Sequence, residues 1–211
     1  MSKLLQSIFP LSIALFMGAT FANAQASIDV FAGVGTAMDS SSGQQIDTFS
    51  TGNPFTTPSL AGAFGKFGAD VMFKPWLGVG AETDFRFSQG AYAGLGYRPL
   101  FYDFNVIWMP TAHRFKRVVP ELQAGIGGSK VSFYANQSYC DAFAGCSSSN
   151  YLVESSNHFQ THLEAGVRFY ATQHLFIRPQ VDAHYINNFF QFGSNWVPEY
   201  GASLGWTFGE H

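Results

Sequence analysis

The stretch that decides the fold is residues 78–87, GVGAETDFRF. Apolar residues and one threonine take every second position, and the positions between them hold glycines, two acids and an arginine. The first set is Val79, Ala81, Thr83, Phe85 and Phe87, and the second is Gly78, Gly80, Glu82, Asp84 and Arg86. Because successive side chains of a strand point to opposite faces, this stretch predicts a strand with one apolar and one charged face.

The same alternation occurs in eight stretches of the chain. Their approximate bounds are 27–38, 60–73, 78–87, 97–109, 119–133, 158–171, 175–186 and 199–208. Glycine shares the charged face in nearly every one. The pattern predicts an all-β fold, an eight-stranded antiparallel up-and-down transmembrane β-barrel with apolar side chains outward. An eight-stranded barrel is only wide enough to be filled by side chains, so we expect a polar, side-chain-filled interior.

Composition supports a membrane location for these strands. Charged residues make up 12% of the chain and aromatic residues 17%, whereas charged residues are about 25% of an ordinary soluble domain. A soluble lipocalin-like barrel, with its apolar face inward, would need a charged exterior that this composition does not supply. The formal net charge of −3 offers no basic field for nucleic acid.

The N-terminus has the features of a secretory signal peptide. Lys3 is followed by an apolar stretch over about residues 8–21 and by Ala22-Asn23-Ala24, a small-x-small cleavage site. We therefore expect residues 1–24 to be removed and residues 25–211 to form one barrel domain of about −4 formal charge. No later stretch reaches the roughly 20 apolar residues that a spanning helix needs.

The connections between the predicted strands alternate in length. Those at 74–76 and 172–174 are tight turns, whereas 39–58, 134–157 and 187–198 are long, and 110–118 is intermediate. Diffuse turn signals at 89–96 leave the strand count open by one hairpin. Long outer loops with short periplasmic turns are typical of outer-membrane barrels, so both termini are expected in the periplasm. The loops 39–58 and 134–157 are the best candidates for specific recognition.

The charged residues of the inward faces are the main candidates for a polar site. We expect ion pairs that fill a narrow lumen, since unpaired burial of a charge is expensive. The alternative is a gated polar path or a proton-linked site. The predicted interior network is Lys66, Asp70, Glu82, Asp84, Arg86, Asp103, Glu121, Glu164, Arg168, Arg178 and Asp182.

Histidines share faces with some of these acids. His158, His162 and Glu164 have one parity in their strand, and Asp182 and His184 repeat the arrangement in the next. A metal site or a histidine–acid catalytic pair is the alternative to ordinary interior histidines. No nucleophile elbow accompanies them, so no catalytic residue, metal ligand or cofactor is predicted.

Three further groups have a structural interpretation. Cys140 and Cys146 lack nearby ligands for a metal, so a disulfide worth roughly 2–3 kcal/mol is expected in an exported protein. Arg114, Lys116 and Arg117 are expected to form a solvated turn, and the alternative is contact with anionic headgroups or a periplasmic partner. Aromatic residues near strand ends are expected to form interfacial girdles rather than a sugar-binding surface: Trp76, Tyr92, Tyr97, Tyr102, Trp108, Trp196 and Trp206.

Taken together, these features resemble the OmpA/OmpX-like small outer-membrane β-barrels of Gram-negative bacteria. The last strand resembles the C-terminal signal read by the barrel-assembly machinery, through Tyr200, Leu204, Trp206 and Phe208, although Gly209, Glu210 and His211 follow it. The resemblance implies an outer-membrane location, contact with outer-membrane lipid and lipopolysaccharide, and the assembly machinery as a partner during biogenesis. No peptidoglycan-binding domain is expected after the barrel.

The expected function is structural. We expect a non-enzymatic outer-membrane protein that presents surface loops and contributes to envelope integrity or adhesion, with an unknown surface ligand. A narrow pore for small solutes is the alternative suggested by the polar interior. A lipid-A-modifying enzyme is a third hypothesis, suggested by the histidines and acids.

Overall fold

The computed structural model describes residues 26–39, 43–47, 50–112, 117–141, 145–189 and 192–209. The predicted signal peptide, residues 1–24, lies outside this part of the chain. Within it, no helix is long and apolar enough to cross a membrane. The long strands are β1 (Ser27–Ala37), β4 (Phe64–Lys74), β5 (Leu77–Arg86), β7 (Leu95–Trp108), β8 (Val118–Asp141), β9 (Gly145–Tyr170), β10 (Leu175–Ile186) and β11 (Trp196–Phe208).

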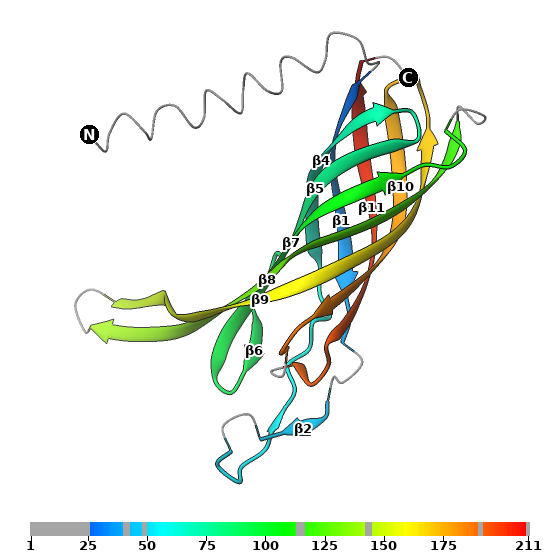
Figure 1. Ribbon diagram of the computed structural model, residues 1–211. Helices are drawn as coiled ribbons and strands as arrows, with labels where there is room; N and C mark the ends of the chain where they lie inside the picture. The colour runs from blue at the N-terminus through cyan, green and yellow to red at the C-terminus, as the bar shows by residue number, and fades with distance from the viewer. Residues whose placement is uncertain are drawn as a thin grey trace, which may run out of the picture.

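These eight strands close into a ring (Figure 1). Each strand pairs antiparallel with its neighbour in the chain, β11 pairs with β1, and β5 pairs with β7. The closing pair of first and last strands runs from Ile28 opposite Phe208 to Ala37 opposite Glu199. The predicted eight-stranded up-and-down barrel is therefore confirmed.

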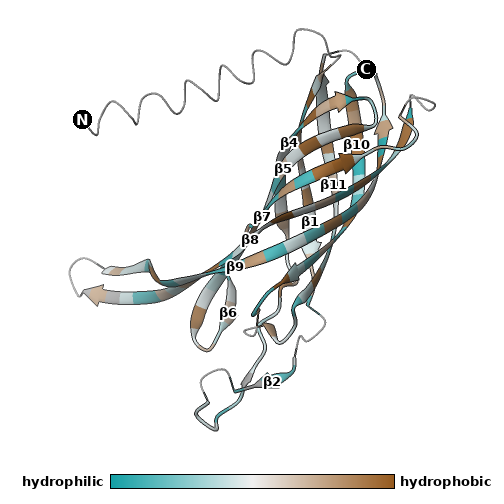
Figure 2. Cartoon of the chain, in the orientation of Figure 1, coloured by the Kyte–Doolittle hydropathy of each residue, from teal (hydrophilic) through white to brown (hydrophobic). Residues whose placement is uncertain are grey.

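Strand alternation separates the two faces of the wall. Large apolar side chains such as Val34, Phe104 and Leu163 are 55–65% exposed on the outside. The sequence neighbours of Phe104 and Leu163 on the other face are buried in the lumen. Figure 2 shows the alternation of apolar and polar residues along the strands. The two-residue period thus places most residues of each class on the predicted face.

Glycine makes room inside the wall, as Gly201 on β11 illustrates. A Cβ on Gly201 would lie 2.8 Å from Cε and 3.0 Å from Cδ of Lys66. The Lys66 side chain therefore crosses the lumen directly over this glycine. A larger residue at position 201 would displace the amine, so glycine on the charged face is a packing requirement.

Apolar clusters occupy both ends of the lumen. The turn end of the barrel contains the 74–77 and 170–175 connections, the start of β1 and the end of β11. The apolar cluster at this end, called the turn-end cluster, consists of Met72, Ile107, Met109 and Val119. The opposite end of the barrel is called the loop end. Its larger apolar cluster, the loop-end cluster, consists of Ala37, Leu60, Phe64, Tyr92, Tyr97, Phe101, Val131, Ile186, Phe189, Phe192 and Val197. The polar side chains of the interior lie between these two layers.

The connections differ in part from the sequence prediction. Residues 134–157 were predicted as a loop, but most of them extend β8 and β9 as a paired hairpin beyond a bulge at Phe133 and Tyr134. Strand pairing satisfies their backbone groups, which the polar composition did not reveal. The uncertain region 89–96 holds β6 (Gly90–Tyr92), which pairs only with the start of β7 and adds no wall strand.

Smaller differences concern strand ends. β4 begins at Phe64 rather than near residue 60, and β11 begins at Trp196, earlier than expected. The predicted loop 39–58 contains a two-residue ladder of β2 (Gln45–Ile46) with β3 (Phe55–Thr56). Strand limits depend on pairing with the neighbouring strand, so they are the least predictable part of the pattern.

Candidate functional site

The barrel interior holds every member of the predicted network as a buried side chain. Arg168 on β9 lies nearest the turn end and is surrounded by three carboxylates. Its guanidinium donates to Asp29 and Glu121, and its Nη2 donates to Asp70 Oδ2 at 2.6 Å. The guanidinium carbon also lies 4.7 Å from the centre of the Phe176 ring. Such a buried arginine requires this degree of pairing.

Arg178 on β10 connects strands from different sides of the ring. Its Nη2 donates to Glu82 Oε2 at 2.8 Å and its Nη1 donates to Glu121 Oε1 at 3.1 Å. The guanidinium carbon lies 4.0 Å from the centre of the Phe31 ring. Arg178 therefore ties β5 and β8 to β10 through the lumen.

Lys66 on β4 is the third central cation and has four acidic neighbours. The distances from its Nζ to the carboxylate oxygens are 2.7 Å for Asp84, 2.9 Å for Glu199, 3.0 Å for Glu82 and 3.3 Å for Asp182. These acids come from β5, β10 and β11. One ammonium group thus holds together strands on both sides of β4.

Arg86 was predicted as part of this network, but it lies apart from it. It forms no ion pair with any described residue. Its Nη1 and Nη2 donate to the backbone oxygens of Ser59 and Ala61 at 3.0 and 2.7 Å, and its Nη1 contacts the Tyr97 hydroxyl. Its position at the β5 terminus places it at the loop end, where it fastens the 59–61 segment over the barrel mouth.

Several interior residues were missed in the sequence. Asp29 and Glu199 pair with Arg168 and Lys66, although neither was predicted in the network. Both follow the inward parity of β1 and β11, and that parity was the available signal. Neutral side chains complete the lumen, although the predicted network contained only charged residues: Asn105, Gln123, Ser129, Gln160, Gln180 and Ser203.

Two histidines lie among these groups. His162 is bracketed by Asn105 Oδ1, 3.0 Å from its Nδ1, and Asp182 Oδ1, 3.2 Å from its Nε2. His184 stacks on His162 with ring centres 4.7 Å apart. Both rings face the lumen, whereas His158 lies half-buried near the loop end and contacts the Asn187 backbone oxygen. Of the three histidines expected on inward faces, only His162 and His184 therefore lie together.

Acids outnumber permanent cations in the described interior. Nine buried carboxylates lie there with Lys66, Arg86, Arg168 and Arg178. The acids are Asp29, Asp70, Glu82, Asp84, Asp103, Glu121, Glu164, Asp182 and Glu199. The lumen is therefore densely paired and holds more carboxyl groups than permanent cations.

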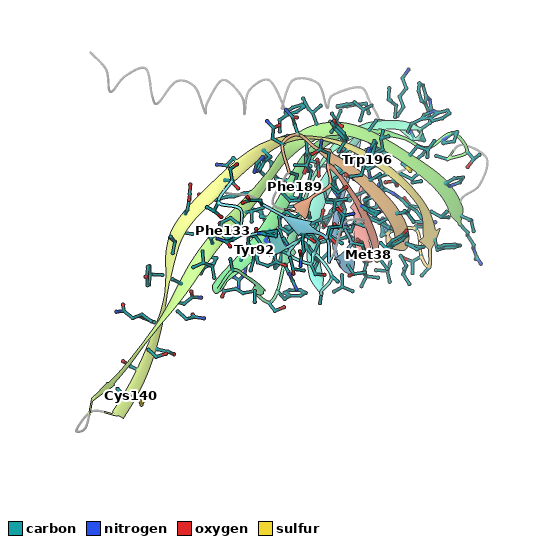
Figure 3. All side chains as sticks on the ribbon, turned by 90° about the horizontal axis from the view of Figure 1, so that it is seen from below. Met38, Tyr92, Phe133, Cys140, Phe189 and Trp196 are labelled. Carbon is teal, nitrogen blue, oxygen red and sulfur yellow. A yellow bond between two sulfur atoms is a disulfide. The ribbon has the colours of Figure 1, made fainter. Side chains whose placement is uncertain are left out.

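The outer hairpin, residues 134–141 of β8 and 145–153 of β9, is the second distinctive feature. Cys140 and Cys146 face each other near its tip and form the predicted disulfide, with a Cα–Cα distance of 4.0 Å. Figure 3, seen along the barrel from below, shows Cys140 far from the wall. The exposed side chains of Tyr151, Leu152 and Val153 lie on this hairpin.

The predictions for the aromatic residues, the basic cluster and the assembly signal are confirmed only in part. Trp76, Tyr102, Trp108, Trp196 and Trp206 are exposed on the outside, consistent with girdles. Tyr92 and Tyr97 instead belong to the buried loop-end cluster, because their parity turns them inward at the mouth. Arg117 is exposed, whereas Arg114 and Lys116 lie outside the described residues. The predicted assembly-signal side chains Tyr200, Leu204, Trp206 and Phe208 all face outward.

Comparison with known proteins identifies the fold. No protein-family model matches the sequence, and no curated protein matches it. Solved structures do match. One is a major outer membrane protein from Thermus thermophilus, with a TM-score of 0.56, 13% identity and coverage of 87% of this chain and 99% of that one. Another is Neisserial surface protein A, with a TM-score of 0.53, 13% identity and coverage of 88% of this chain and 98% of that one. A third is Ail of Yersinia pestis in complex with the heparin analogue sucrose octasulfate, with a TM-score of 0.51, 13% identity and coverage of 87% of this chain and 99% of that one. The chain thus has the fold of the small outer-membrane β-barrels, as its resemblance to OmpA/OmpX-like proteins implied.

Proposed function

We propose that the protein is a non-enzymatic outer-membrane β-barrel of a Gram-negative bacterium that presents a recognition hairpin at the cell surface. The outer hairpin is the observation that carries this proposal. It continues β8 and β9 for eight further residue pairs, from Tyr134 opposite Leu152 to Asp141 opposite Gly145, a length of about 25 Å. Its pairing and disulfide make it a preorganised arm rather than a mobile loop, which lowers the entropy lost on binding.

The outward surface supports a membrane location. Aliphatic and aromatic side chains cover the wall, and the buried charges all point inward. Wall strands such as β10, with 12 residues, are long enough for the 9–11 residues that a tilted spanning strand needs. A closed ring also leaves no unpaired strand edge in lipid.

The lengths of the connections support an outward-facing loop end. The β4–β5 turn at the turn end is short, whereas the β8–β9 hairpin and the longer β1–β4 connection belong to the loop end, and outer-membrane barrels have short periplasmic turns and long extracellular loops. We therefore place both termini and the short turns in the periplasm, and the outer hairpin outside the cell. We also propose contact of the wall with lipopolysaccharide and assembly by the barrel-assembly machinery.

The composition of the outer hairpin suggests the class of partner. The Ail structure contains a sulfated heparin analogue, but the segment 134–153 of this chain contains no lysine, arginine or histidine to bind such a polyanion. Serine, asparagine and tyrosine dominate the hairpin, a composition that favours hydrogen bonds and aromatic contacts. We therefore propose a neutral partner, a protein or an uncharged glycan, and an adhesive role.

The two alternative functions have less support. A pore would have to pass both apolar clusters and the ion pairs between them. A lipid-A-modifying enzyme needs catalytic groups that reach lipid, but His162 and His184 are buried in the lumen, 2% and 0% exposed. These observations favour a filled barrel that serves as a scaffold.

Surface display of matched variants tests the proposal. One variant replaces residues 134–153 with Asn-Gly, which joins Phe133 to Glu154 through a tight turn. A second changes Tyr151, Leu152 and Val153 to serine. Cells displaying the unaltered protein should adhere to members of a panel of immobilised matrix proteins and neutral glycans more than to heparin, and both variants should lose that adhesion. Equal adhesion of all strains, or recovery of the protein in the soluble periplasm, would contradict the proposal.

A further inference from the structure

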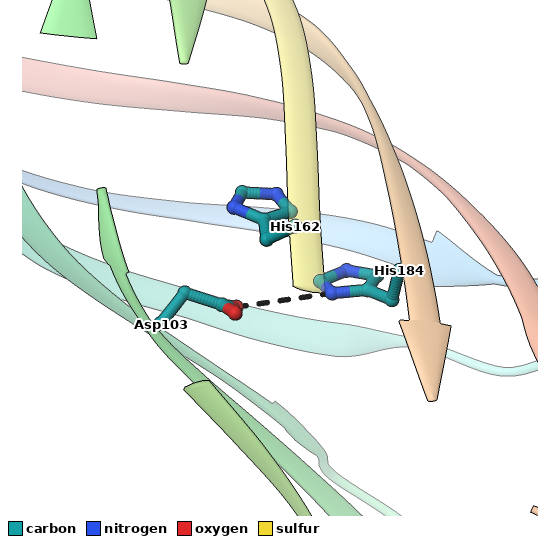
Figure 4. A group of neighbouring side chains, drawn as sticks. All are labelled: Asp103, His162 and His184. Atoms are coloured by element: carbon teal, nitrogen blue, oxygen red, sulfur yellow. Dashed lines mark ion pairs between the residues drawn. The ribbon is translucent and has the colours of Figure 1, made fainter. Parts of the chain in front are cut away.

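We propose that the barrel interior binds one divalent transition-metal ion between Asp103, His162 and His184. The three residues come from β7, β9 and β10 and converge just beneath the loop-end cluster (Figure 4). Each offers one ligand atom, and the three atoms lie within 4.8 Å of one another. Two imidazoles and a carboxylate form a donor set that suits zinc and similar borderline ions.

The spacing of two of the donor atoms, those of Asp103 and His184, fits an ion with little adjustment. Asp103 Oδ2 lies 3.8 Å from His184 Nδ1, too far for a hydrogen bond. Two ligands that each lie roughly 2.0–2.2 Å from a tetrahedral zinc are about 3.3–3.6 Å apart. Side-chain shifts of a few tenths of an ångström would therefore bring both atoms within bonding distance of one ion.

Unpartnered atoms point to a ligand at this position. His184 is completely buried, yet neither of its ring nitrogens has a hydrogen-bond partner, and Asp103 Oδ2 has none either. Buried polar atoms in native structures nearly always have a partner. An ion between Asp103 Oδ2 and His184 Nδ1 would satisfy both atoms at once.

The surrounding contacts are of the kind that support metal ligands. Asp103 Oδ1 accepts a hydrogen bond of 2.7 Å from Gln160 Nε2, which leaves Oδ2 for the ion. His162 contacts Asn105 through one nitrogen and Asp182 through the other. When one nitrogen turns to a metal, the second keeps its contact and orients the ring, as is usual for metal-bound histidines.

Charge selects this group over two overlapping sets of potential ligands. Asp84, His184 and Glu199 form one alternative, and His162, Glu164 and Asp182 form the other. Both include carboxylates that lie within 3.3 Å of the Lys66 ammonium, which would repel a second cation. Asp103 has no ion pair with a lysine or arginine among the described residues. The excess of buried carboxylates over cations further favours cation binding.

Burial determines how the ion would enter. Phe101 stacks on His184 with ring centres 5.1 Å apart and belongs to the loop-end cluster, which covers the site. The ion should therefore be captured while the barrel closes and should exchange slowly afterwards. This behaviour distinguishes an interior site from zinc bound at exposed histidines.

Metal analysis of the full chain, isolated in its processed form from membranes and refolded, tests the inference. The protein is unfolded with a chelator, refolded with or without Zn²⁺, washed with chelator and analysed by mass spectrometry. We expect about one zinc per chain after refolding with Zn²⁺ and almost none when Zn²⁺ is added only after folding. A chain that retains no zinc, or that gains it equally after folding, would overturn the inference.

Matched variants locate the ion. Asp103→Asn and His184→Gln should each lower retained zinc at least about tenfold, whereas His158→Gln, on the same strand as His162, should retain the wild-type amount. Folding is checked by the faster gel migration of unheated barrels. If His184→Gln does not fold, Asp103→Asn and His162→Gln decide the question. Refolding with Co²⁺ gives a second readout, since histidine-bound cobalt has visible absorption bands that only the binding variants should show. Folded Asp103→Asn with unchanged zinc would refute the site.

Discussion

Arg178 on β10 donates a 2.8 Å hydrogen bond from Nη2 to Oε2 of Glu82 on β5, directly across the barrel. The two strands are four places apart in a ring of eight, so the contact spans its full width. Two side chains that meet across the lumen obstruct it at that level. The contact also stabilises the ring as a whole rather than one strand pair.

Loss of this contact should destabilise the barrel strongly. Arg178→Ala leaves Glu82 and Glu121 with one cation fewer in a buried environment, and we expect a loss of about 3–5 kcal/mol in the free energy of unfolding. Urea unfolding in detergent micelles measures it. The double variant with Glu82→Ala should lose less than the sum of the two single changes. Additive losses would show that the two residues do not interact.

The filled lumen predicts an absence of ion conduction. The ion pairs of Arg168, Arg178 and Lys66 lie between two apolar clusters, so a hydrated ion has no continuous path. Planar-bilayer recordings of the purified protein should show no conductance steps above those of the detergent control. Reproducible steps that scale with protein concentration would require that the interior rearranges in the membrane.

The outward face predicts a depth-dependent response to charge. Leu163 on β9 is 55% exposed on the wall, and Leu163→Arg should cost about 2–4 kcal/mol in bilayer stability near the midplane. Tyr151→Arg, on the outer hairpin of the same strand, should change stability by less than about 0.5 kcal/mol. Unfolding titrations in lipid vesicles compare the two. Similar costs would indicate that the wall does not contact lipid.

The disulfide should stabilise the outer hairpin alone. Cys140→Ser with Cys146→Ser removes a short ring worth roughly 2–3 kcal/mol, but the described part of the outer hairpin, residues 134–141 and 145–153, forms no ion pair with the interior network. Limited proteolysis should therefore cut the segment 134–157 faster, while the heat-induced gel shift of the barrel stays unchanged. If barrel unfolding shifted by the same amount, the hairpin would be coupled to the wall.

Much of the interior could be predicted from parity. Asp84 and Arg168 occur at alternate positions beside apolar residues, and this is sufficient to place them inside. Their partners could not be predicted in the same way. Arg168 meets Asp29, a residue 139 positions away, through strand register that depends on every intervening connection. The extension of β8 and β9 was missed because a polar hairpin lacks the apolar alternation that reveals a wall strand.

The sequence alone determined the barrel architecture, with its strand count open by one hairpin, and the face to which most wall residues turn, because a two-residue period and a low charge content allow one barrel orientation. It also predicted the disulfide, because the chain has only two cysteines. Only the tertiary structure decided which acid meets which base, how the two apolar clusters close the lumen, and that Asp103, His162 and His184 converge. Those relationships arise from ring closure, which sets residues far apart in sequence against one another at one level of the barrel.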